Sequence, residues 1–232
     1  ANINFNGSTV RAKSTNADFI ETNTTTTINA NVQAGGAIFD TTNGATSYSI
    51  TIKQPLIHDP ALGATLDGGL TKNGLGTLTL APVAGPNTYT GPTTVNLGVL
   101  AVSGTSIDDL GKLDIVGGKV SIPAATNETV KTLFFNGVQQ AAGVYGSSAS
   151  GASPGFQNDT YFDVAGTGTL TVTSGTAAAS YASWASAFTS PALSNTAATA
   201  DPDGDGLANS VEYVIGGDPR VSSQSGRPAA SP

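Results

Sequence analysis

The sequence predicts an all-β protein made of short strands stacked as successive coils, with a small helical module after them. Residues 77–80 (TLTL) and 94–97 (TVNL) alternate apolar and polar side chains, which is the period of a half-buried strand. Gly, Pro and Asn separate such runs at short intervals, and no helical period intervenes. We therefore expect a stiff β-coil stack, an architecture typical of proteins that act outside the cell.

The expected strands follow one another through residues 1–175. Ile3 and Phe5 begin the series, and strand-like runs follow at 28–32, 113–116, 120–122, 130–135 and 169–172. Residues 74–80 (GLGTLTL) and 166–172 (GTGTLTV) echo each other, which favours equivalent positions on stacked coils. The pair Asn136-Gly137 is typical of a two-residue hairpin turn, so some antiparallel pairing is expected there.

The stretch from residue 69 to residue 102 resembles the autotransporter-associated β-strand repeat. The matching positions are Gly69, Leu70, Lys72, Gly74, Gly76, Thr77, Leu78, Leu80, Asn87, Tyr89, Gly91, Thr93 or Thr94, Val95, Gly98 and Leu100. The resemblance implies a right-handed parallel β-helix in an exported, passenger-type bacterial protein. Because only one full copy is present, a long shaft cannot come from a single chain of this kind.

Composition narrows the possible partners and compartments. The 232 residues carry a net charge of −7, which argues against nucleic acid and anionic membrane surfaces, since both require a basic face. Cysteine is absent, so a disulfide framework, a thiol nucleophile and a zinc–thiolate site are excluded. We expect an extracellular or bacterial cell-surface location and no membrane span in this chain.

The composition changes near residue 176, where the expected β-helix domain (1–175) ends. Residues 176–200 are rich in Ala and predict a helical linker, with Tyr181, Trp184 and Phe188 on one helical stripe that docks onto the β body. Residues 201–219 predict an EF-hand-like calcium loop. Residues 220–232 form a polar tail rich in Ser and Pro.

Residues 201–212 fit the calcium-loop pattern D-x-D-x-D-G-x5-E. Calcium takes about six to eight hard oxygen ligands, which this pattern supplies at alternate positions. The expected ligands are the carboxylates of Asp201, Asp203 and Asp205, the carbonyl of Leu207, the side chain of Asn209 directly or through water, and both carboxylate oxygens of Glu212. We therefore expect calcium as the cofactor.

The residues after this loop predict a short helix with an apolar stripe at Leu207, Val211, Val214 and Ile215, and Gly216-Gly217 is the stop signal. The segment resembles a dockerin-like or thrombospondin type 3-like calcium module. A single loop has no paired partner, so a structural calcium is favoured over a sensor.

No catalytic constellation is evident in the sequence, and we expect no enzyme activity. The acids outside the calcium loop are scattered, and Asp108-Asp109 would point to opposite faces of a strand. His58 lies in a turn bounded by prolines, and no G-x-S-x-G elbow supplies a nucleophile. Tyr145, Phe156, Tyr161 and Phe162 form either a core or end cap or, less favoured, a sugar-stacking platform.

These features predict an extracellular structural protein, a self-assembling filament or a surface-layer or sheath subunit stabilised by calcium. Strand-like residues 3–10 leave the first coil uncovered, and an uncovered end favours self-association into a homopolymer. A monomeric surface adhesin of the autotransporter-passenger type, with glycan or cell-surface contacts, is the alternative. A polysaccharide lyase or hydrolase is the least favoured reading.

Overall fold

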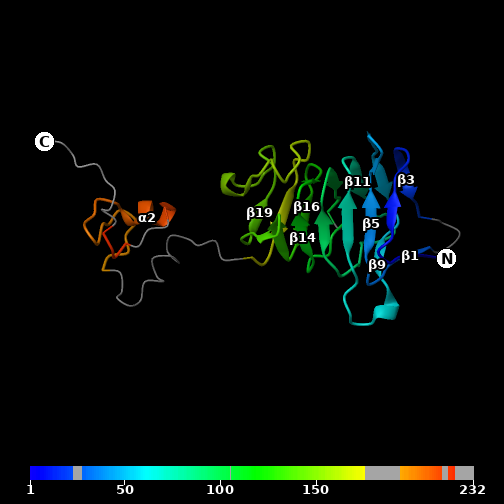
Figure 1. Ribbon diagram of the computed structural model, residues 1–232, viewed down its shortest axis with the longest axis horizontal. Helices are drawn as coiled ribbons and strands as arrows, with labels where there is room; N and C mark the ends of the chain where they lie inside the picture. Colours follow the sequence, from blue (N-terminus) through cyan, green and yellow to red (C-terminus); the bar gives the residue numbers. More distant parts are fainter. Residues whose placement is uncertain (23–27, 105, 176–193, 216–218, 223–232) are drawn as a thin grey trace. The chain divides into compact units, whose positions relative to one another are not determined.

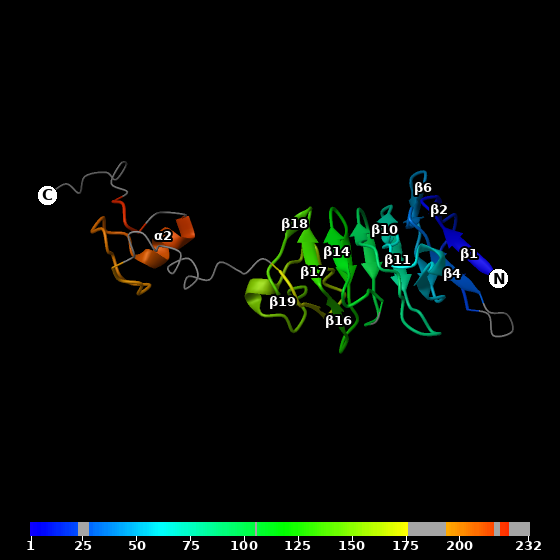
Figure 2. The same cartoon turned by 90° about the horizontal axis from the view of Figure 1, so that it is seen from below.

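The computed structural model describes residues 1–22, 28–104, 106–175, 194–215 and 219–222. The chain divides into two compact units, Ala1–Thr176 and Ala177–Pro232. The first unit is built from strands, most of them paired in parallel, and is shown in Figures 1 and 2. The expectation of an all-β body is confirmed.

The largest sheet of the first unit has seven strands in the order β18-β17-β14-β12-β10-β5-β2. Their bounds are β2 (Thr9–Arg11), β5 (Ala37–Asp40), β10 (Leu70–Asn73), β12 (Thr93–Val95), β14 (Lys112–Ile115), β17 (Thr132–Phe135) and β18 (Val138–Gln139). All neighbours in this sheet pair in parallel except β17 and β18.

A second sheet of five strands runs in the order β15-β13-β11-β8-β3 and is parallel throughout. Its strands are β3 (Asn16–Ile20), β8 (Ile50–Ile52), β11 (Thr77–Leu80), β13 (Val99–Ala101) and β15 (Lys119–Ser121). After β10 the chain alternates between the two large sheets, because β10, β12 and β14 are followed by β11, β13 and β15. Figure 2 shows the strands succeeding one another from blue to green.

Smaller sheets complete the body. One has the order β1-β4-β9, another β16-β20-β19, and β6 pairs with β7 as a hairpin. Their bounds are β1 (Asn2–Phe5), β4 (Asn29–Val32), β6 (Thr42–Asn43), β7 (Thr46–Ser47), β9 (Leu56–His58), β16 (Asn127–Val130), β19 (Gly143–Tyr145) and β20 (Thr169–Val172). Two short 3-10 helices, η1 (Pro60–Leu62) and η2 (Pro154–Phe156), lie in connecting loops.

Alternation within each strand builds the core. In the five-stranded sheet, parallel pairing aligns Ile50, Leu78, Leu100 and Val120 in one column. Each of these side chains is buried, while the Thr, Ala and Ser positions between them face outward and are half-buried. The column shows that the TLTL-type pattern specifies which face is buried, as strand periodicity requires.

Several strands differ in extent from the sequence expectation. The run at 94–97 contributes only β12, because the Asn96 side chain bonds to Asn73 and the chain then turns at Gly98, whose φ is 66°. The run at 130–135 is divided between β16 and β17. Residues 74–80 and 166–172 contribute β11 and β20, which belong to different sheets, so the echo does not mark equivalent positions of one wall.

The antiparallel hairpin expected at Asn136-Gly137 is confirmed. Phe135 pairs with Val138 across the turn, and both turn residues have positive φ, 48° and 79°. This geometry matches the two-residue turns that fit the twist of antiparallel strands.

An aromatic cluster lies near the last strands of the body. Phe135 stacks on Tyr161 with ring centroids 4.2 Å apart, and it meets Tyr145 and Phe162 edge-on. Phe156 contacts Tyr145 edge-on at 4.9 Å. Tyr145 and Phe162 are buried, so these rings form an end cap, and the sugar-stacking alternative is not supported.

In the second unit, the helix within the described residues is α2 (Asn209–Ile215), which directly follows the acidic loop. Its stripe is incomplete, because Val211 is exposed. The expected linker residues Tyr181, Trp184 and Phe188 and the stop at Gly216-Gly217 lie outside the described residues. No helix in the described part of the chain has the length and apolar character needed to cross a membrane.

Candidate functional sites

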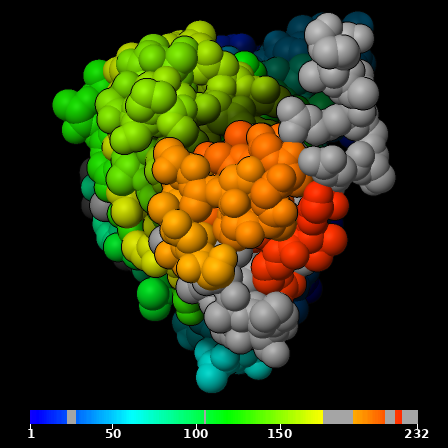
Figure 3. Space-filling view, turned by 90° about the vertical axis from the view of Figure 1, so that its left-hand side faces the viewer, coloured from blue at the N-terminus to red at the C-terminus, as the bar shows by residue number. Residues whose placement is uncertain are grey.

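The acidic loop of the second unit brings three carboxylates together. One carboxylate oxygen each from Asp201, Asp203 and Asp205 lies within 4.8 Å of the others. In the space-filling view of Figure 3, the residues of this region, in orange, form a close-packed surface. Glu212, which the sequence expects to close the site, is buried on α2 and lies outside this cluster of the described residues.

Backbone hydrogen bonds hold the loop in its turned shape. Asp201 Oδ1 accepts from the amides of Gly204 (2.9 Å) and Asp205 (3.2 Å), and its Oδ2 accepts from Gly206 at 2.8 Å. The φ of Gly206 is 86°, a conformation that favours glycine. Asp205 Oδ1 accepts from the amide of Leu207 at 2.7 Å. The loop thus curls around its acidic side chains.

Asn209, the first residue of α2, is fully buried and only partly satisfied. Its Nδ2 donates to the carbonyls of Asn195 (2.8 Å) and Ala197 (2.9 Å), whereas its Oδ1 has no hydrogen-bond partner. Asp203 Oδ2 is likewise a buried acceptor without a partner. Burial, followed by the neighbouring charges of Asp205 and Asp201, raises the pKa of Asp203. Buried acceptors of this kind need a donor or a cation.

The chemistry of this donor set fits a hard divalent cation. All of the expected side-chain ligands supply oxygen, and calcium prefers carboxylate, amide and carbonyl oxygens. Two buried acceptors without a hydrogen bond, Asp203 Oδ2 and Asn209 Oδ1, belong to expected ligands. The aspartate cluster and the buried amide oxygen therefore suit calcium, whereas the loop offers no nitrogen or sulfur ligand.

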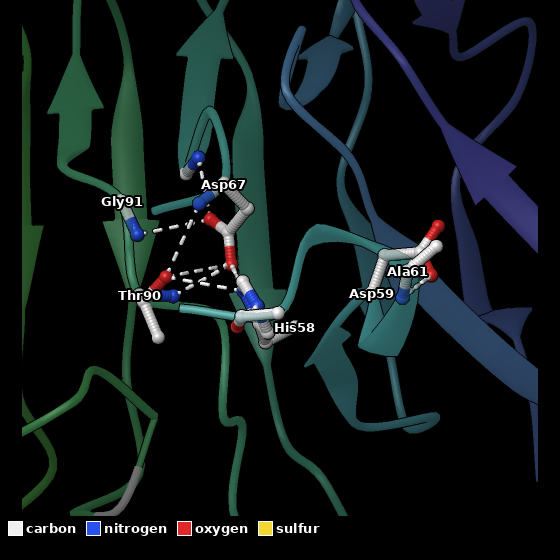
Figure 4. Close-up of polar contacts among 8 residues, drawn as sticks. His58, Asp59, Ala61, Asp67, Thr90 and Gly91 are labelled. Carbon is white, nitrogen blue, oxygen red and sulfur yellow. Dashed lines mark hydrogen bonds and ion pairs between the residues drawn. The ribbon is translucent and has the colours of Figure 1, made fainter. Parts of the chain in front are cut away.

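In the β body, His58 at the end of β9 contacts three residues that come later in the chain, and Figure 4 shows Asp67 and Thr90 beside it. His58 Nδ1 lies 2.9 Å from Asp67 Oδ2 and 3.2 Å from Thr90 Oγ1. His58 Nε2 lies 3.1 Å from the carbonyl oxygen of Gly63. The hydrogen bond to Asp67 raises the pKa of His58, which favours the imidazolium form.

This trio of residues is not arranged as a catalytic triad. In a triad, the acid and the nucleophile contact different nitrogens of the histidine ring. Here Asp67 and Thr90 share Nδ1, and a carbonyl faces Nε2. The arrangement holds the imidazole ring against Asp67, Thr90 and Gly63, so it links the loop that carries η1 to the residues around Thr90.

Asp67 is buried and satisfies several donors at once. Its Oδ1 accepts from the amides of Gly69 and Gly91, both at 2.9 Å, and its Oδ2 accepts from the amide of Thr90 at 2.7 Å. Burial alone would raise the pKa of Asp67, but these bonds and the one from His58 outweigh it, and the pKa is lowered. The carboxylate therefore joins three successive parts of the chain.

Asp59, beside His58, has a local role. Its Oδ1 accepts from the amide of Ala61 at 2.9 Å and caps η1, and its Oδ2 accepts from Gln33 Nε2 at 2.6 Å. These two hydrogen bonds lower the pKa of Asp59.

Lys72, a position of the repeat, is 0% exposed. Its Nζ donates to Thr41 Oγ1 (2.9 Å) and to the carbonyls of Asn73 (2.9 Å), Gly74 (2.7 Å) and Leu97 (3.0 Å). Burial lowers the pKa of Lys72 to about 8, and the charge of Asp40 offsets this only in part. The ammonium group thus joins three neighbouring segments of the chain, so this lysine serves packing.

Two further positions of the repeat are also internal. Asn87 Oδ1 accepts from the amide of Leu56 (2.8 Å), and its Nδ2 donates to the carbonyl of Ser106 (2.7 Å). The hydroxyl of buried Tyr89 lies 2.7 Å from Thr93 Oγ1. These polar side chains of the repeat therefore link adjacent segments of the body.

Glu128 was not identified from the sequence as a buried group. It lies in β16 and is fully buried, and its carboxylate accepts from the amides of Ser106 (3.1 Å) and Ile107 (3.3 Å). Burial raises its pKa. The signal was present in the alternation, because Glu128 stands two residues before buried Val130 and so shares its face.

A family model matches the stretch of the chain that holds Lys72, Asn87 and Tyr89. Residues 70–102 match the passenger-associated-transport-repeat. The repeat expected at residues 69–102 is thereby confirmed, and it indicates a surface or secreted protein. It covers β10 to β13, including Lys72, Asn87 and Tyr89. No curated protein and no solved structure matches the chain.

Proposed function

We propose that this chain is a passenger-type protein of a bacterial surface, displayed or secreted, whose β body acts as a stiff stalk with an adhesin-like role. The observation that carries the proposal is the match of residues 70–102 to the passenger repeat, within a body of successive parallel strands. Within the matched stretch, Lys72, Asn87 and Tyr89 make polar contacts inside the body, which suits a stiff support.

We infer that the body is a right-handed parallel β-helix. Two sheets add strands in the same chain order, β10, β12, β14 in one and β11, β13, β15 in the other, which supports a coil that returns to each sheet once per turn. Buried columns run across these strands, as expected when like residues stack on like positions.

A structural role also accounts for the buried polar groups better than catalysis does. Lys72, Asn87 and Asp67 each bond to backbone groups of adjacent segments. The only histidine has its two ring nitrogens against Asp67 and Gly63, so it does not activate a nucleophile. We propose that the chain is not an enzyme. Turnover on a panel of pectin, alginate and glucan substrates would contradict this.

Surface display is tested by protease treatment of intact cells that produce the protein. The expected result is removal of the chain by external protease under conditions that leave a cytoplasmic marker intact. A chain that is protected until the cells are lysed would contradict the proposal. Binding to a glycan array or to host-matrix proteins then tests the adhesin role.

We further propose that calcium braces the second unit. Asp201, Asp203, Asp205, Leu207, Asn209 and Glu212 would hold it, and the bound ion would offset the repulsion between neighbouring carboxylates. The supporting observation is the pair of buried acceptors at Asp203 Oδ2 and Asn209 Oδ1.

Calcium binding is measured by isothermal titration calorimetry on the full chain. We expect one site per chain, with Asp203→Asn weakening it at least tenfold. Asp109→Asn, an exposed acid of the β body, is the matched control and leaves binding unchanged. Binding that is absent, or equally strong in both variants, contradicts the site.

Self-association is a second candidate function, and one observation favours it. Among the described residues, β1, β2 and β3 each form the last strand of a sheet, so one edge of each pairs with no other strand of this part of the chain. Exposed strand edges are templates for pairing with another chain. The homopolymer expected from the sequence requires a second, complementary open end.

A further inference from the structure

The loop that carries η1 (residues 59–67) projects from the β body and is drawn in cyan at the lower edge of Figure 1. Most of it is exposed, and Leu66 is 66% exposed. The backbone hydrogen bonds of residues 60–66 stay within residues 59–65. One further contact, between the carbonyl oxygen of Gly63 and His58 Nε2, ties the middle of this loop back to the end of β9.

Both ring nitrogens of His58 face oxygen atoms that accept hydrogen bonds. Nε2 lies 3.1 Å from the carbonyl oxygen of Gly63, and Nδ1 lies 2.9 Å from the carboxylate of Asp67, which Figure 4 shows beside the ring. A neutral imidazole carries a hydrogen on one nitrogen, so it can donate to one of these oxygens and not to both. The imidazolium form donates from both nitrogens, so the geometry suits the protonated ring.

The two acceptors differ in how firmly they are held. The carboxylate of Asp67 is buried and accepts from the backbone amides of Gly69, Thr90 and Gly91, whereas the carbonyl of Gly63 belongs to the exposed loop. A hydrogen bond to a carboxylate is also stronger than one to a carbonyl. When the ring loses one proton, the remaining hydrogen therefore stays on Nδ1, and Nε2 turns a lone pair toward the oxygen of Gly63.

The charged groups that act on the ring are two carboxylates. The hydrogen bond to Asp67 is the main cause that raises the pKa of His58, burial opposes it, and the charges of Asp67 and Asp59 add to it. Thr90 places an uncharged hydroxyl 3.2 Å from Nδ1, and the neighbouring strand β4 pairs Val32 with His58. The surroundings of the ring therefore favour its protonated form.

The backbone at Gly63 is shaped for this contact. Its φ of 58° and ψ of −119° form a combination that glycine adopts and other residues avoid. A Cβ at this position would meet no atom within 4 Å, so conformation and not space requires glycine here. The turn that brings the carbonyl to the ring is therefore easily lost once the hydrogen bond to His58 is gone.

We propose that the loop of residues 59–67 is a pH-sensitive element, which a protonated His58 holds folded against the end of β9 and which loss of that proton releases at residues 60–66. The change is local, because the backbone amides that hold Asp67 belong to Gly69, Thr90 and Gly91, outside the released segment. This inference goes beyond the passenger role and does not rest on it.

Spin labelling of the full chain tests the release. The chain has no cysteine, so Ala64→Cys takes a nitroxide label at one exposed position of the loop. We expect the mobile fraction in its electron paramagnetic resonance spectrum to rise at least threefold from pH 5.5 to pH 8.5. In a His58→Gln background the fraction should not change with pH. Gly151→Cys, in another exposed loop, is the labelling control, and its spectrum should be independent of pH.

The protonation of the ring is measured separately by NMR. His58 is the only histidine, so its ring signals need no further assignment. Their titration midpoint is expected above the ordinary histidine value of about 6.5 and should coincide with the midpoint of label mobility. Gly63→Ala disfavours the folded turn without a steric clash, so it should raise the mobile fraction at pH 5.5 at least threefold. Circular dichroism checks that each variant folds.

Equal mobility of the Ala64→Cys label at both pH values overturns the proposal, as does a pH-dependent change that persists in the His58→Gln background. A mobility midpoint that departs from the ring midpoint by more than about one pH unit also overturns it, because another group would then control the loop. Each of these outcomes leaves the protease test of surface display unchanged, so failure of the pH-sensitive loop and failure of the proposed function are distinguishable.

Discussion

Single polar side chains inside the β body make hydrogen bonds that apolar residues cannot make. Lys72, Asp67 and Asn87 each bond to backbone groups of neighbouring segments at corners where strands end. Because a buried polar group without partners is costly, each of these side chains specifies one alignment of adjacent segments. The sequence marked Lys72 as a position of the repeat. The sequence did not indicate the hydrogen-bond partners of His58, because these partners depend on which segments of the chain lie next to each other in the folded body.

The substitution Lys72→Ala is expected to destabilise the β body by about 3–5 kcal/mol, because it removes a donor from four buried acceptors and leaves a cavity. The free energy of unfolding in urea measures this loss. Lys13→Ala, at an exposed position, is the control and is expected to stay within about 0.5 kcal/mol of the wild type. Equal stability of the two variants would contradict the role of Lys72.

The contact between His58 and Asp67 predicts a pH dependence of stability. The pKa of His58 is raised in the folded protein, so the folded chain binds this proton more tightly than the unfolded chain does. The stabilisation is fully present below the ordinary histidine pKa of about 6.5 and is lost as pH rises through the folded value. We expect a contribution of about 1 kcal/mol at this partly exposed site.

Urea unfolding of wild type and His58→Gln at pH 5.5 and pH 8.5 measures this effect. The wild type should exceed the variant at pH 5.5 by more than it does at pH 8.5. A difference that is constant with pH, or larger at pH 8.5, would show that the charged ring does not contribute.

At the scale of elements, alternation in the sequence predicts strands well and their sheets poorly. Residues 169–172 were expected as a strand and are β20, but β11 with the same pattern lies in a different sheet. Alternation fixes the buried face of a strand, and the corners decide where the strand ends and which sheet it joins. The acidic loop was the clearest local signal, because its ligand types and spacing are confined to twelve residues.

Gly76 shows how tightly one corner is packed. A Cβ at this position would collide with the carbonyl oxygen of Tyr48. Gly76→Ala is therefore expected to cost about 1–3 kcal/mol through displaced backbone. Gly151→Ala is the matched control, because a Cβ there meets no atom within 4 Å. Thermal unfolding of both variants compares them, and an equal melting temperature would remove the steric argument.

At the scale of the whole chain, the two units are held by different means. Strand pairing and a buried core stabilise the body. Residues 201–212, in contrast, bring carboxylates close together, and these carboxylates repel one another. Calcium is therefore expected to protect the second unit selectively, because a ligand stabilises only the part of the chain that binds it. The sequence places a change of composition near residue 176, and the two compact units meet at Thr176 and Ala177.

Hydrogen–deuterium exchange with calcium and with a chelator tests this selectivity. Amides of residues 201–212 should exchange at least tenfold more slowly with calcium, and amides of β10 to β13 should not change. Asp205→Asn should abolish the difference. Protection that spreads equally over both units would contradict a local site.

The asparagine contacts between neighbouring layers also bear on how this protein unfolds under mechanical force. Asn29 bonds back to Asn2 over 27 residues, and Asn96 bonds back to Asn73 over 23 residues. A pull on the amino-terminal end meets these layers one at a time, since each strand bonds only to the layers on either side. The body would then lengthen in small repeated steps, and each step would absorb mechanical work. The chain has no cysteine, so no disulfide would stop the extension.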